Sequence, residues 1–234
     1  MFQLIKYELR GKLLTLMGIC LVVIMGNAFL IVKNGSGGTG VAILSTFLGV
    51  GALVVACISS LTMISDYLYT EQGYLLFTLP QSGVSIMTSR LVAAVLQISL
   101  VAVVSIVMFC LVDQGRLLQA LSRNSELTDL LYSILMYLWT IVSTLTFIYF
   151  CMVVGKIALK GKMLGKIGSF IIFILLCIVK AGLTATISNF FPQIVELNSI
   201  TVLTINIGST LADLIIFALL FSGTSYLLEH RVNL

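Results

Sequence analysis

The chain has 234 residues, of which 59% are apolar and only 9% are charged, and its mean hydropathy is +1.16. Soluble domains carry about 25% charged residues, so this composition excludes an ordinary soluble domain. The net charge of +4 is too small to indicate nucleic-acid binding. The composition therefore predicts an all-α integral membrane protein, because backbone groups in hydrocarbon must be hydrogen-bonded within their own segment.

The first twelve residues alternate apolar and charged side chains. Phe2, Ile5 and Leu9 recur at helical spacing, which predicts a short helix lying in the headgroup plane over residues 1–12. The uncharged run that follows is longer than the ~7–15 residues of a signal peptide. We therefore expect it to be retained as a membrane span.

Six apolar runs are each long enough to cross a bilayer, which takes about 20 helical residues. They predict spans at about residues 13–32, 41–65, 84–112, 130–155, 167–190 and 206–228 within a single transmembrane domain, 1–234. The last apolar stretch, residues 197–228, is longer than one span needs. Because Pro192 precedes it, we expect a break from Asn189 to about Ile205 that includes a short helix dipping into the outer leaflet.

The basic residues predict the orientation of the chain. With six spans, both termini lie on one side, and nine of the thirteen lysines and arginines fall on that side: Lys6, Arg10, Lys12, Arg90, Lys156, Lys160, Lys162, Lys166 and Arg231. The opposite side carries Lys33, Arg116 and Arg123. The positive-inside rule then places both termini in the cytoplasm. The predicted location is a bacterial cytoplasmic membrane.

Catalytic and metal-binding patterns are not found in the sequence. The sole histidine, His230, lies near the C-terminus, and the five cysteines all fall in apolar runs without metal-site spacing. The loop GKIALKGKMLGK from Gly155 departs from a phosphate-binding loop, because Lys160 stands where Gly is needed and Met163 follows Gly161-Lys162. We interpret it as a basic loop that sets topology and contacts anionic membrane lipid. No catalytic residue, metal or bound cofactor is predicted.

Two ionisable residues fall inside predicted spans. Lys180 and Asp213 both lie about 20 Å from the cytoplasmic ends of consecutive antiparallel helices. Charges at this depth are costly unless they are paired or hydrated. Three interpretations stay open: a structural pair that joins the last two helices, a part of a translocation path or gate, or unpaired groups exposed to water.

The segment from Asp66 to Arg90 is the longest polar interruption between two spans, and the predicted topology places it in the cytoplasm. Pro80 ends any preceding helix near Leu79, and Ser82 can cap the next one. This pattern indicates a short helix along the membrane surface that could act as a lever on both spans. An ordinary interfacial loop fits the same residues.

The run EQGYLLFTLPQSGVSIMTSRL, from Glu71 to Leu91, resembles the cytoplasmic segment of ABC-2-type transporter permeases. In that family an acidic residue, a TLP triplet, a small polar residue and a Lys or Arg opening the third span recur. The N-terminal YELR, the six-span count and the irregular segment before the last span are also similar. Arg90 stands at the family's Lys and keeps the charge.

The resemblance implies a membrane subunit whose coupling helix docks into a separate nucleotide-binding ATPase subunit, which would bind the ATP and Mg. The implied coupling residues are Glu71, Gly73, Tyr74, Thr78, Leu79 and Pro80. It further implies pairing with a second permease copy or a similar chain. Related small permeases act in export of, or resistance to, antimicrobial peptides, or in lipid, polysaccharide or drug export.

The main alternative is a six-span substrate-binding component or a secondary transporter without ATP-driven coupling. A secondary carrier would be expected to bury more acidic or histidine residues than Asp213 alone. A structural or regulatory membrane anchor is the third possibility.

Overall fold

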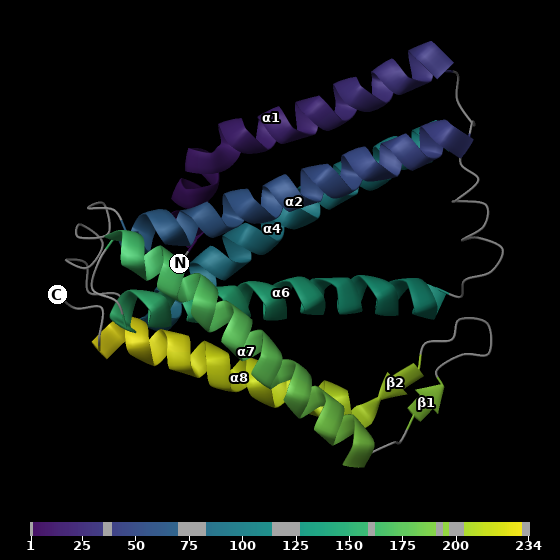
Figure 1. Cartoon of the computed structure of the whole chain (residues 1–234). Helices are drawn as coiled ribbons and strands as arrows, with labels where there is room; N and C mark the ends of the chain where they lie inside the picture. The colour runs from purple at the N-terminus through teal and green to yellow at the C-terminus, as the bar shows by residue number, and fades with distance from the viewer. Residues whose placement is uncertain are drawn as a thin grey trace. The chain divides into compact units, whose positions relative to one another are not determined.

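The computed structural model describes residues 2–34, 39–69, 83–113, 127–158, 162–190, 194–196 and 204–230. In this part of the chain, six helices are long and apolar enough to cross a membrane (Figure 1). They are α1 (Phe2–Asn34), α2 (Thr39–Tyr69), α4 (Gly83–Val112), α6 (Leu127–Ala158), α7 (Lys162–Phe190) and α8 (Ile207–His230). The predicted multi-pass helical membrane protein is thus confirmed.

The helices expose apolar side chains and bury polar ones, which is the distribution expected in lipid. Leu14 and Val32 are each 86% exposed, whereas Ser60 and Thr146 are fully buried. Hydrocarbon tails solvate leucine and valine as well as a protein core does, so burying them gains little. Small polar residues instead face neighbouring helices, where they find hydrogen-bond partners.

The described chain groups into two compact units. The first unit contains residues 1–64 and 88–142, and the second contains residues 65–87 and 143–234. The prediction of a single transmembrane domain stays a prediction.

In the first unit, α1 and α2 are joined by polar contacts near both ends. Lys12 Nζ donates a hydrogen bond to Thr62 Oγ1 at 3.0 Å, and Ser45 Oγ donates to Asn27 Oδ1 at 2.6 Å. The contacts occur in opposite order along the two helices, so α1 and α2 run antiparallel. Asn27 and Ser45 are both buried, and Asn27 Nδ2 also donates to the Val23 carbonyl at 2.9 Å.

In the second unit, α6 packs closely against α7. A Cβ atom on Gly155 of α6 would lie 2.7 Å from the backbone N and Cα of Ser169. Farther along, the rings of Phe147 and Phe173 meet edge to face with centroids 5.6 Å apart. Glycine is therefore required at position 155 for the backbones to approach this closely.

The C-terminal part of α6 also contacts α8, and α8 packs against α7. A Cβ atom on Gly223 of α8 would lie 3.2 Å from Cε2 of Phe150. Helices α7 and α8 lie side by side in Figure 1 and are in direct contact. The last two spans and the end of α6 thus form one packed group.

The segment before the last span differs from its prediction. A break after α7 is present, but its described residues form an antiparallel pair of strands, β1 (Ile194–Glu196) and β2 (Thr204–Asn206), instead of a short helix. Val195 pairs with Ile205. At these six residues the prediction of a helix was wrong, because β-branched side chains favour a strand and strand pairing satisfies the backbone groups. Residues 191–193 and 197–203, over which the rest of the short helix was predicted, lie outside the described residues.

The N-terminal residues do not form the separate short helix that the sequence predicted. Residues 2–12 belong to the same continuous helix as the first span, since α1 runs from Phe2 to Asn34 without interruption. At about 1.5 Å per residue, α1 is about 50 Å long, more than the ~30 Å hydrocarbon core. The helix is therefore longer than one crossing needs, and the interfacial placement of residues 1–12 stays a prediction.

Candidate functional site

Two charged residues of α7 and α8 form an ion pair within the membrane-spanning region. Lys180 Nζ lies 3.1 Å from Asp213 Oδ1. The two atoms are within ion-pair distance, but their geometry is not that of a hydrogen bond. The structure therefore brings together the two charges that the sequence predicted at matching depth.

The ion pair lies nearer to the end of the helices that β1 and β2 connect. At about 1.5 Å per residue, Lys180 is about 10 Å from the Ile187 end of its span, and Asp213 is about 8 Å from the Gly208 end of its own. The side chains are 37% and 35% exposed. Both side chains are thus partly exposed, although the Asp213 Oδ1 atom that contacts Lys180 is itself buried, and they lie at a depth where lipid solvates charge poorly.

Hydroxyl side chains follow the ion pair on α7. Thr184 Oγ1 donates to the Lys180 carbonyl at 2.9 Å, and Thr186 Oγ1 donates to the Gly182 carbonyl at 2.9 Å. These bonds satisfy the hydroxyls within their own helix, as is usual for threonine in membrane spans. A Cβ atom on Gly182 would meet no atom within 4 Å, so this stretch of α7 is open to its surroundings.

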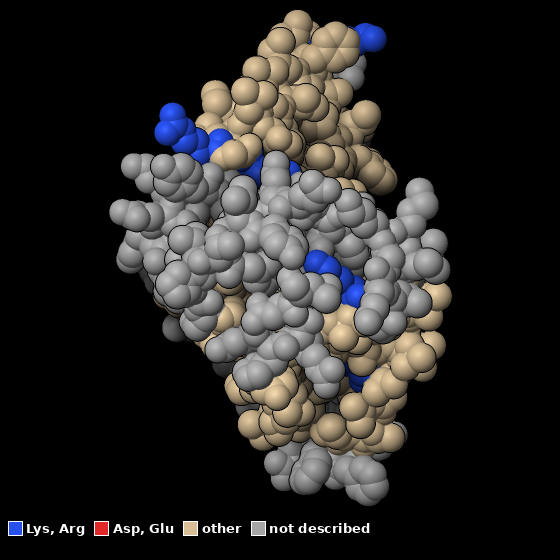
Figure 2. Space-filling view, turned by 90° about the vertical axis from the view of Figure 1, so that its left-hand side faces the viewer, with Lys and Arg blue, Asp and Glu red and all other residues tan. Residues whose placement is uncertain are grey.

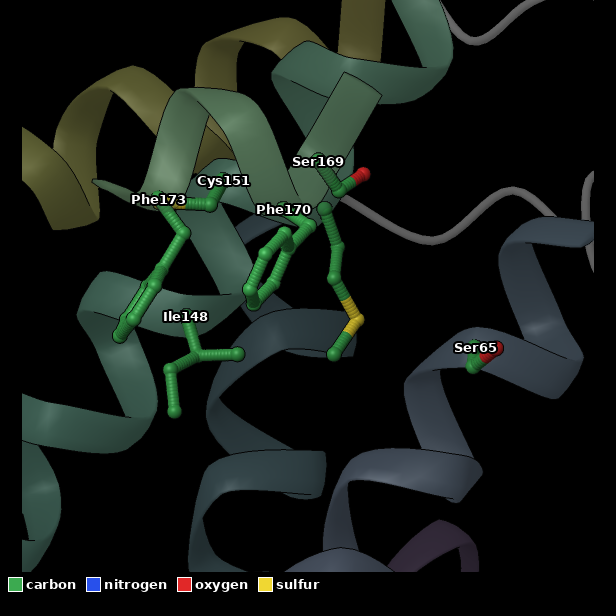
Figure 3. A pocket seen from close by; sticks show the side chains of 7 residues that line it. Ser65, Ile148, Cys151, Ser169, Phe170 and Phe173 are labelled. Atoms are coloured by element: carbon green, nitrogen blue, oxygen red, sulfur yellow. The ribbon is translucent and has the colours of Figure 1, made fainter. Parts of the chain in front are cut away.

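A cavity of about 300 Å³ lies at the other end of the same unit (Figure 3). Helix α6 lines it with Ile148, Cys151 and Met152, and α7 lines it with Ser169, Phe170 and Phe173. Figure 3 shows Ser65 of α2 standing apart from these side chains at its edge. The walls are almost entirely apolar, so the cavity suits a hydrocarbon group. Sequence reasoning did not find it.

The cations near the predicted cytoplasmic helix ends include Arg10, Lys12, Arg90 and Lys156. On the face drawn in Figure 2, lysine and arginine atoms are visible among the described residues and no aspartate or glutamate atoms are. Among the described residues there is also no cluster of three histidine, cysteine or acidic side chains that could hold a metal ion.

The six residues predicted to couple the chain to an ATPase, Glu71 to Pro80, lie outside the described residues. The structure describes both neighbouring helices, with α2 ending at Tyr69 and α4 beginning at Gly83. In the first two turns of α4, Ile86, Met87 and Arg90 are buried, whereas Val84 is 44% exposed.

Comparison with protein-family models, with curated proteins and with solved structures finds no match for this chain.

Proposed function

We propose that this chain is the permease subunit of an ATP-driven exporter and works with a separate ATPase subunit. The observation that carries the proposal is that the segment resembling the permease family connects two membrane-spanning helices. Helix α2 continues to Tyr69 and α4 begins at Gly83, so residues 70–82 are joined at each end to a membrane-spanning helix. A partner that moves this segment would therefore act on two spans together.

Burial at the start of α4 supports efficient transmission of such a movement. Met87 is 2% exposed and Arg90 is 7% exposed, although most of the spanning surface faces lipid. Close-packed side chains transmit displacement because protein interiors are dense and have low compressibility. A force on the preceding segment would thus be passed to the buried side chains at the start of α4.

The ion pair supports a second part of the proposal, which is that two six-span halves assemble around a path. A pair of charges with one third of its surface exposed costs free energy against hydrocarbon. A hydrated path or a second permease copy over Lys180 and Asp213 would remove that cost. In this arrangement the exported molecule passes along the α7–α8 surface.

Affinity purification from the native host tests the proposal. We expect the tagged wild-type chain to copurify with a nucleotide-binding ATPase subunit. Glu71→Lys combined with Leu79→Asp should abolish copurification while the membrane level of the chain is unchanged. Glu126→Lys is the matched control, because it reverses an acidic charge in a loop predicted on the opposite side, and it should retain the ATPase.

Two results would overturn the proposal. One is the recovery of no ATPase subunit with the wild-type chain. The other is transport in sealed inverted vesicles that needs an ion gradient and continues without ATP. The second result would instead establish the secondary transporter that the sequence leaves open.

A further inference from the structure

The cavity between α6 and α7 adjoins an exposed, apolar surface of α7. None of residues 170–187 of α7 is buried, and Phe170, which lines the cavity, is 64% exposed. A hydrocarbon group can therefore reach the cavity from the surrounding lipid without crossing a polar layer. Its volume of about 300 Å³ equals the lower end of the range for pockets that hold small molecules.

The depth of the cavity matches the first part of a lipid chain. Met152 is about 8 Å from the Ile157 end of the α6 span, and Phe173 is about 8 Å from the Gly168 end of the α7 span. Both of these helix ends lie on the same side, since α6 and α7 are consecutive antiparallel helices. The cavity therefore lies in one leaflet, just below the headgroups.

A lysine lies one helical turn above the cavity on α6. Lys156 follows Met152 by four residues, which places both side chains on the same face of the helix, with Lys156 nearer to the membrane surface. Lys156 is half-buried and occupies the last turn of α6. A cation on the cavity's face of α6, between the cavity and the helix end, favours a molecule with an anionic head and a hydrocarbon tail.

The inner wall of the cavity is rigid. Ser169 contributes to the lining and also forms the close backbone contact with Gly155, which holds α6 and α7 together at this level. Phe173 is likewise held by its edge-to-face contact with Phe147. Because the cavity is preformed, little entropy is lost in ordering its side chains when an acyl chain enters it.

We propose that this cavity is a binding site for an anionic phospholipid from the leaflet on the Lys156 side. One acyl chain fills the space between Met152 and Phe173, and the phosphate headgroup is held by Lys156. The site is independent of the ATPase partner and of the exported molecule. It is therefore present in the chain on its own in vesicles.

The single tryptophan of the chain, Trp139, makes a direct measurement possible. In a Trp139→Phe background, Phe173→Trp introduces one fluorescent reporter into the cavity. The protein is reconstituted in phosphatidylcholine vesicles that contain brominated phosphatidylglycerol or, in the parallel sample, brominated phosphatidylcholine. Phe170→Trp is a second reporter, for use if Phe173→Trp does not fold. Phe170 lies at the exposed mouth of the cavity, where the larger tryptophan ring is tolerated.

We expect brominated phosphatidylglycerol to quench the cavity tryptophan with about fivefold higher apparent affinity, which corresponds to ~1 kcal/mol for one lysine near the surface. Lys156→Gln should remove this preference. Ile58→Trp in the same background is the matched control, because Ile58 is 56% exposed at a similar depth on α2 and should show no preference.

Native mass spectrometry gives a second readout on the otherwise wild-type chain. We expect one phosphatidylglycerol to remain bound to the wild-type chain and to be lost from Lys156→Gln. Lys33→Gln is the control, because it removes an exposed lysine at the opposite helix end, and it should keep the lipid. Equal quenching by the two brominated lipids at both reporters, or a preference that survives Lys156→Gln, would overturn the site. Neither result depends on whether an ATPase subunit exists.

Discussion

Lys180 of α7 and Asp213 of α8 place opposite charges 3.1 Å apart within the membrane, with about a third of each side chain exposed. A fully buried pair would indicate a purely structural contact between the two helices. A fully exposed pair would be unstable in hydrocarbon. The observed arrangement joins α7 to α8 and still presents charge to whatever lies against these helices.

Removing one member of this pair should be worse than removing both. Lys180→Met or Asp213→Leu alone leaves a single unpaired charge within a span, at a cost of up to about 2.5–3.5 kcal/mol, which is the figure for the middle of a span. The double variant leaves no charge, so its stability should return to near that of the wild type. Unfolding in mixed micelles measures the free energy of unfolding of each variant. If the double variant were as unstable as the single variants, the ion pair would be contradicted.

Activity of the double variant separates the two roles of the pair. If Lys180 and Asp213 line the path, the double variant Lys180→Met, Asp213→Leu should fold normally. It should nevertheless lose most of its ATP-dependent transport. The charge-reversed variant, Lys180→Asp with Asp213→Lys, should restore part of it. Full transport by the uncharged double variant would limit the pair to joining α7 and α8.

Hydropathy alone was enough to predict six helices able to cross a membrane. The third span was expected at residues 84–112, and α4 runs from Gly83 to Val112. Long uncharged runs leave no alternative to a spanning helix, because backbone groups must be satisfied within the segment. The predicted alignment of Lys180 with Asp213 followed from the same counting of residues along antiparallel helices.

Contacts between helices were not predictable in the same way. The approach of Gly155 to Ser169, the buried bond between Asn27 and Ser45, and the cavity above Phe173 each depend on which faces meet. Hydropathy averages over all faces of a helix and carries no such information. Asn27, a strongly polar residue within a long uncharged run, was a signal that could have indicated a helix contact.

Gly155 should be intolerant of even the smallest side chain. In Gly155→Ala the new Cβ would lie 2.7 Å from backbone atoms of Ser169, so α6 and α7 must separate. Overpacking of this kind costs about 1–3 kcal/mol. Gly182→Ala is the matched control, because its Cβ meets no atom within 4 Å, and it should be neutral. Thermal unfolding in detergent compares the two, and equal midpoints would contradict the close contact.

The hydrogen bond between Ser45 and Asn27 should contribute measurably to the packing of α1 on α2. Ser45→Ala leaves the buried Asn27 carbonyl without its donor, and we expect a loss of about 0.6–1.7 kcal/mol. Ser222→Ala is the control, since Ser222 is exposed and its hydroxyl donates to carbonyls of its own helix, at 2.8 Å to Ala218 and 3.1 Å to Leu219. A double-mutant cycle with Asn27→Ala should show coupling of the same size, and additive effects would contradict it.

The orientation of the chain determines whether an ATPase can reach the segment between α2 and α4. In a background with the five native cysteines replaced by alanine, Ser82→Cys and Ser125→Cys place single thiols in consecutive loops. The excess of basic residues on the side of residue 82 predicts that this loop is cytoplasmic. A membrane-impermeant maleimide should therefore label Ser125→Cys in intact cells and Ser82→Cys only after permeabilisation. The reverse pattern would place residues 70–82 outside the cell, where no cytoplasmic ATPase could act on them, and the exporter proposal would fail with it.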